Sequence, residues 1–75
     1  MSYKVVKTKD VVSSTITKIA HTDAGDLVVS FTNGTDYMYK AVPEDVYEAM
    51  EKAESVGKFL NANIKNKFTF EKLTK

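Results

Sequence analysis

The chain has 75 residues, no cysteine and a formal net charge of +1, which suits one small domain and excludes disulfides and cysteine-based metal sites. A net charge so close to zero provides no global attraction for nucleic acid or lipid. No apolar run reaches the length of a membrane span, and the N-terminus lacks the apolar block of a signal peptide. We therefore expect a cytoplasmic protein, and the initial Met1 favours a complete chain.

The charges are unevenly distributed along the chain. Lysines dominate both ends, whereas carboxylates dominate residues 43–54. All 11 cations are lysines, and a lysine attracts phosphate as a point charge without the two-pronged contact that arginine makes. Any contact with nucleic acid is therefore expected to involve the backbone more than the base edges.

The first part of the chain predicts a three-stranded antiparallel meander. Residues 1–10 are polar and lysine-rich, and we expect a flexible N-terminal arm there. Residues 14–22, "STITKIAHT", are rich in β-branched side chains, which is typical of a strand. Residues 26–32, "DLVVSFT", alternate between apolar and polar, and "TDYMYK" at 35–40 returns after the strong hairpin signal of Asn33-Gly34.

The hairpin loop decides which way two tyrosines point. A two-residue loop turns Tyr37 and Tyr39 away from the apolar face of the preceding strand, as an exposed aromatic platform. A three-residue loop, with Gly34 in the left-handed conformation as a bulge, places Tyr37 opposite Val29 and Tyr39 opposite Leu27.

The charged neighbours of these tyrosines favour the bulged register. In the two-residue register, Asp36 and Lys40 lie on the core face, where two charges without assured partners cost several kcal/mol. In the bulged register both charges lie in solvent. Tyr37 and Tyr39 are then mainly structural, with hydroxyls that can reach the rim of the sheet.

The next segment has the pattern of a helix. Pro43 suits a first helical position, and Glu44 and Asp45 favour the positive end of the helix dipole. One buried stripe is expected, made of Val46, Tyr47, Met50 and Ala53.

A second helix is predicted directly afterwards. Ser55 is its expected cap, and its apolar stripe consists of Val56, Phe59, Leu60 and Ile64. Gly57, one turn in, predicts a close backbone approach. Phe68 and Phe70 alternate, which is compatible with a short C-terminal strand or with an apolar edge for a second copy, so a homodimer stays an option.

These elements predict an α+β fold, a three-stranded antiparallel meander followed by two helices packed on one face (β-β-β-α-α). The domain is expected to span residues 11–70, with a C-terminal tail at 71–75.

No catalytic or metal-binding motif is present in the sequence. Nucleophile-elbow, phosphate-loop and metal-ligand patterns are absent. Ser13, Ser14 and Ser55 would act as nucleophiles only beside a base, and His21, the sole histidine, has no partner recognisable from the sequence. We predict backbone-bonding serines, a surface histidine, no enzyme activity, no cofactor and no metal.

The segments "VVSSTI", "LVVSFTNGTDYMYKAVP", "VYEAM" and "SVGKFLNANIKNKF" together resemble the KTSC domain family, which is named after the C-terminus of some lysyl-tRNA synthetases. This family also occurs as small stand-alone bacterial and phage proteins and carries a central Tyr-x-Tyr motif, matched here by Tyr37 and Tyr39. The synthetase context implies RNA, in particular RNA like a transfer RNA, as a partner. Lys65 stands where the family often carries an arginine, which weakens an implied phosphate clamp there but keeps the charge.

Two functions are compatible with these observations. The first is a non-catalytic module that binds RNA through a basic face of the second helix. Its candidate residues are Lys58, Asn61, Asn63, Lys65, Lys67, Tyr37 and Tyr39. The second is a protein-interaction module, such as a small bacterial or phage regulator or inhibitor that docks on a host or cognate protein; the acidic first helix, which repels phosphate, favours it. The basic residues are equally typical of a solvated helix face.

Overall fold

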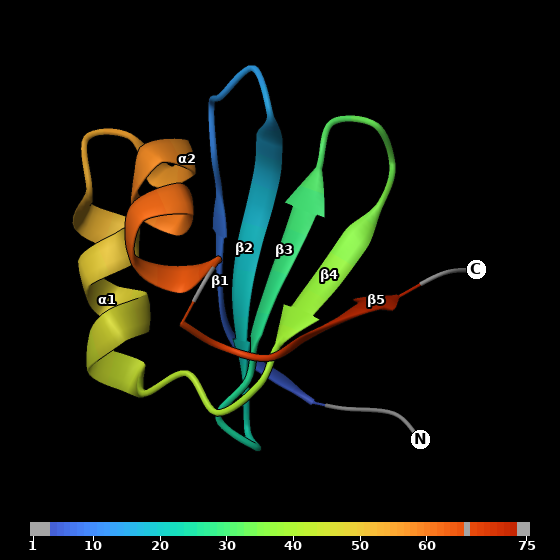
Figure 1. Ribbon diagram of the computed structural model, residues 1–75, viewed down its shortest axis with the longest axis vertical. Helices are drawn as coiled ribbons and strands as arrows, with labels where there is room; N and C mark the ends of the chain where they lie inside the picture. The colour runs from blue at the N-terminus through green and yellow to red at the C-terminus, as the bar shows by residue number, and fades with distance from the viewer. Residues whose placement is uncertain (1–3, 66, 74–75) are drawn as a thin grey trace.

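The computed structural model describes residues 4–65 and 67–73 and contains a five-stranded antiparallel sheet with its helices packed on one face (Figure 1). The strands are β1 (Val5–Asp10), β2 (Ile16–Thr22), β3 (Leu27–Phe31), β4 (Asp36–Tyr39) and β5 (Phe70–Leu73), side by side in that order. The helices are α1 (Glu44–Lys52), α2 (Val56–Phe59) and the π-helical turn η1 (Leu60–Ile64), which continues α2. The predicted α+β class is confirmed.

The predicted number of strands is wrong. Residues 1–10 were expected to form a flexible arm, but β1 lies within them and pairs with β2. The tail expected at 71–75 contains most of β5, which pairs with β4 along its whole length; residues 74–75 lie outside the described part. The ordered domain therefore extends beyond the predicted limits of 11–70 at both ends.

Strand β1 is attached to helix α1 by its lysines. The Lys7 ammonium forms ion pairs with Glu44 and Glu48, at 2.8 Å from Glu48 Oε2, and Lys9 Nζ donates a hydrogen bond to the Glu51 carbonyl. Hydrogen bonding to Glu44 and Glu48 raises the pKa of Lys7, and the same contact lowers the pKa of Glu48. Both lysines lie on a strand whose side chains are mostly exposed, so no apolar pattern identifies it in the sequence.

The β3–β4 hairpin has the three-residue bulged loop that the sequence favoured. Val29 pairs with Tyr37 and Leu27 pairs with Tyr39, and Gly34 has a φ of +89°. Tyr39 is only 3% exposed within the core between sheet and helices, whereas Tyr37 is half-buried at its margin. Both tyrosines therefore face the helices.

The helices bury most of the predicted side chains, with Val46, Ala53 and Phe59 only half-buried, and they do so in more than one regular stretch. Tyr47 and Met50 of α1 are fully buried. Ser55 caps α2 through its Oγ, which accepts from the Lys58 N–H at 3.3 Å. A side chain at Gly57 would meet Ser13 Oγ only at 4.0 Å, so the predicted close approach is wrong.

The sheet face away from the helices carries a smaller apolar cluster. Ala20, Val28 and Met38 are each 5% exposed, and Leu73 packs against them. These residues alternate along their strands with the side chains that face the helices. In the part of the chain that the structure describes, no helix is both long and apolar enough to cross a membrane.

Candidate binding groove

A groove lies between the sheet and the α2–η1 segment, and it consists of two adjoining hollows. The first, an aromatic cleft of about 350 Å³, is lined by residues of β3, β4, β5 and η1. The second, a hydroxyl-rich hollow of about 230 Å³, lies between α2 and the segment before β2. Phe31, Leu60 and Asn61 line both, so the two hollows form one continuous surface.

Four aromatic rings build the cleft. The Tyr37 ring lies 5.4 Å from Phe31, edge to face, and 5.5 Å from the tilted ring of Phe70, which is also 5.5 Å from Tyr39. Phe70 is 49% exposed, so it and Tyr37 present ring surface to solvent while Tyr39 supports them from below. Burial raises the pKa of the Tyr39 hydroxyl, and the neighbouring Tyr37 adds to the rise.

The polar groups of the groove are lysines, amides and hydroxyls. Lys65 and Asn61 lie at the cleft, Lys58 lies at the second hollow, and all three are exposed. No carboxylate of the described residues lines either hollow. The groove therefore combines stacking surface with positive charge.

The lysines of the groove are not neutralised by helix α1. Within residues 4–65 and 67–73, the glutamates of α1 that form ion pairs do so with Lys7, and no ion pair involves Lys58, Lys65 or Lys67. Two acids of α1, Glu44 and Glu48, thus pair with β1, and no ion pair among the described residues occupies the lysines along α2–η1.

The π-helical turn shapes one wall of the groove. Lys65 N–H donates to the Leu60 carbonyl at 2.8 Å, the five-residue spacing of a π-helix. Leu60 and Ile64 are buried, while Asn61 between them is exposed. Such widened turns are rare and occur frequently at functional sites.

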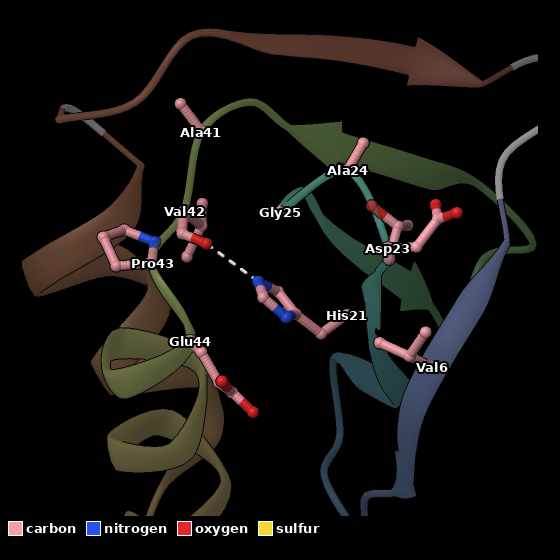
Figure 2. A pocket seen from close by; sticks show the side chains of 10 residues that line it. Val6, His21, Asp23, Ala24, Gly25, Ala41, Val42, Pro43 and Glu44 are labelled. Atoms are coloured by element: carbon pink, nitrogen blue, oxygen red, sulfur yellow. Dashed lines mark hydrogen bonds between the residues drawn. The ribbon is translucent and has the colours of Figure 1, made fainter.

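A separate hollow of about 480 Å³ surrounds His21 at the far end of the sheet (Figure 2). The expected surface position of His21 is wrong, because the residue is only 5% exposed. Its ring stacks 5.2 Å from the Tyr47 ring, and its Nε2–H donates to the Val42 carbonyl at 2.8 Å. The sequence could not show this contact, since the acceptor is a backbone carbonyl 21 residues away. Figure 2 shows the ring directed at that carbonyl from β2, so His21 fastens the β4–α1 connection to the sheet.

Of the candidate binding residues predicted from the sequence, the groove brings together Lys58, Asn61, Lys65, Tyr37 and Tyr39. Asn63 is half-buried and Lys67 is exposed, and neither lines the groove. The prediction missed Phe31, Phe70 and Asn33 as lining residues. The sequence pattern places Phe70 in a short strand or at an apolar edge, and Asn33 in a turn.

A five-stranded antiparallel sheet with helices over one face and a groove between them defines a small α+β domain. The family model of the KTSC domain matches residues 12–68, so the chain belongs to the KTSC domain family, as its resemblance predicted. The crystal structure of a KTSC domain protein from Yersinia pestis is similar to it, with a TM-score of 0.82 and 33% identity over 91% of this chain and 97% of that one.

A protein from Tsukamurella paurometabola is 40% identical over 42 residues, which cover 56% of this chain. The chain spans 63% of the length of that relative.

Proposed function

We propose that this protein is a small non-catalytic domain that binds single-stranded RNA in the groove between its sheet and the α2–η1 segment. One observation carries the proposal: a cleft of aromatic rings adjoins lysines that have no acidic partner among the described residues. An unpaired base stacks on Tyr37 and Phe70, and Lys65 and Lys58 attract the phosphates on either side.

Known energies of such contacts support this assignment. Stacking of one base on an aromatic side chain contributes about 1–3 kcal/mol, and each phosphate contact makes the affinity depend on salt. The hydroxyls of Ser13, Ser14 and Ser55 line the second hollow, and hydroxyls of this kind can bond to ribose and phosphate oxygens. A duplex does not offer splayed bases to such a cleft, so single-stranded segments are the expected ligands.

The proposal is tested by fluorescence anisotropy with a labelled single-stranded RNA at low salt. The double variant Lys58→Glu with Lys65→Glu is expected to lose most of its affinity, because two attractive charges in the groove become repulsive. The matched control is Lys4→Glu with Lys18→Glu, which changes the net charge equally at two exposed positions outside the groove. An equal loss in both double variants would show that only net charge matters and would contradict binding in the groove.

A second candidate function is docking of another protein, or of a second copy, on an edge of the sheet. Strands β1 and β5 are the outer strands, and they carry the exposed apolar side chains of Val5, Val6 and Phe70. Edge strands with such side chains can pair with a further strand. If an affinity pull-down returns one dominant protein after nuclease treatment, and the chain binds no RNA, this second function replaces the first.

A further inference from the structure

Asn33 belongs to the aromatic cleft as well as to the hairpin turn. Its side chain lines the aromatic cleft together with Tyr37, Phe70 and Lys65. Its Oδ1 accepts a hydrogen bond from the Thr35 N–H at 3.0 Å, which fixes which end of the amide faces the turn. The two hydrogens on Nδ2 are therefore left for another acceptor.

Two side chains at the cleft, Asn33 and Lys65, present hydrogen-bond donors, whereas the hydroxyls of Tyr37 and Tyr39, which also line it, can donate or accept. Asn33 offers Nδ2–H, and the Lys65 ammonium has donors and no acceptor. The amide of Asn61 can present either end, since it is exposed and none of the described residues holds it in a hydrogen bond. A ligand in this cleft consequently meets two groups, Asn33 Nδ2 and Lys65 Nζ, that can donate hydrogen bonds but cannot accept them.

We propose that the cleft selects guanine over adenine, with Asn33 as a specificity-determining residue; this inference rests on the proposed RNA binding. Guanine presents two adjacent acceptors, N7 and O6, on one edge, and a lysine commonly binds this edge. Adenine presents an N6 amino donor at the position of O6. Against Asn33 and Lys65 that donor faces another donor, so adenine forms fewer hydrogen bonds in the cleft than guanine does.

The test is a competition among short RNAs that differ in one base. The host is a single-stranded oligouridine with one central guanine, adenine or 7-deazaguanine, and its affinity is measured by fluorescence anisotropy at constant salt. The guanine strand is expected to bind about tenfold more tightly than the adenine strand. The 7-deazaguanine strand, which lacks the N7 acceptor, is expected to lie between them.

Asn33→Asp sharpens the test because it keeps an oxygen acceptor for the Thr35 N–H and removes the two amide donors. This variant is expected to lose the preference for guanine. The matched control is Asn63→Asp, which makes the same charge change at a position that does not line the cleft. It is expected to lower the affinity for all strands alike and to keep the preference, with circular dichroism confirming that both variants are folded.

The outcomes separate this inference from the function on which it rests. If the wild-type protein binds all strands equally and its affinity falls with salt, RNA binding stands and base selection is overturned. If it binds no strand, both are overturned. Should Asn33→Asp fail to fold, the base series on the wild-type chain alone decides, and a preference for adenine or uracil refutes the inference.

Discussion

At the scale of single residues, Ala41 has an unusual backbone. Its φ of 57° is left-handed, and among the described residues it is the one non-glycine with positive φ. Two hydrogen bonds hold it there: Ala41 N–H donates to Asp26 Oδ1 at 2.9 Å, and the next residue, Val42, donates its N–H to the Gly25 carbonyl at 2.8 Å. The conformation positions the Val42 carbonyl that His21 contacts, so the strain is stored at the junction of sheet and helix.

Ala41→Gly is expected to raise the free energy of unfolding by about 0.5–1 kcal/mol. A left-handed alanine costs about 1–2 kcal/mol, part of which is offset by the greater flexibility of glycine in the unfolded chain. Urea denaturation followed by circular dichroism measures the change. Gly34→Ala is the converse control, because Gly34 has φ +89° and open space around it, so that only backbone strain opposes the new methyl group. A lower stability for Ala41→Gly would contradict the assignment of strain.

Tyr47 links burial to alkaline stability. It is fully buried, and its hydroxyl donates to Glu51 Oε2 at 3.2 Å. Burial, with a contribution from Glu51, raises its pKa from 10.0 to about 12. Between pH 10 and pH 12 the unfolded chain has lost this proton while the folded chain retains it. The contribution of Tyr47 to the free energy of unfolding is therefore complete and constant below pH 10. It is lost progressively as the pH rises from 10 to 12.

The measurement is a series of urea denaturations at pH 8 to 12 on the wild-type chain and on Tyr47→Phe. The variant keeps the buried ring and is expected to show a shallower fall, because it lacks the titrating hydroxyl. Some fall remains, because the pKa values of Tyr39 and Lys7 are also raised. Titrations of tyrosinate absorbance on both proteins give the pKa of Tyr47 by difference, since the chain has four tyrosines. Identical pH profiles for the two proteins would refute the assignment to Tyr47.

Local sequence features predicted some residue positions and could not predict others. Asp36 and Lys40 lie close to Tyr37 and Tyr39 in the chain, and the cost of burying their charges selected the correct register. His21 and Asn33 have environments set by residues distant in the chain or by a neighbouring element. The sequence therefore could not predict their contacts, which are known only from the folded structure.

At the scale of elements, the helices and the central strands were predicted from apolar periodicity. Strand β1 was missed and β5 was predicted only as one option, a short C-terminal strand, because pairing with a neighbour holds both edge strands, together with the lysine contacts of β1. The π-helical turn was also missed, because Leu60 and Ile64 fit the spacing of a regular helix in the sequence. The cleft depends on β5 and on the π-helical turn, since β5 supplies Phe70 and η1 supplies Asn61.

Strand β5 contributes to the proposed binding through the ring of Phe70. Phe70→Leu keeps an apolar side chain on the strand but removes the ring face that is offered to a base. Affinity for single-stranded RNA is expected to fall at least about fivefold, whereas the free energy of unfolding changes by less than about 1.5 kcal/mol. Anisotropy titration and urea denaturation of the same preparation separate the two effects. Unchanged affinity in a folded Phe70→Leu variant would exclude stacking on this ring.

At the scale of the whole molecule, the near-zero net charge is the sum of acidic and basic side chains that lie on different parts of the surface. Glu44 and Glu48 of α1 pair with Lys7 on β1, and the lysines of α2–η1 lie beside a groove without carboxylates among the described residues. The composition excluded a strong overall electrostatic field. It could not show that the acidic and basic side chains lie on different parts of the surface. Local charge at the groove, and not net charge, therefore determines how such a domain would meet an anionic strand.

Salt dependence tests the path of the strand across this surface. The logarithm of affinity is expected to fall linearly with the logarithm of salt concentration, with a slope of about −0.7 for each phosphate contacted. Lys58→Gln and Lys65→Gln should each make the slope shallower by about 0.7, because each removes one phosphate contact in the groove. Lys67→Gln should leave the slope unchanged, since Lys67 lines neither hollow. If Lys67→Gln alters the slope as much as the other two, the strand follows the exposed helix face and not the groove.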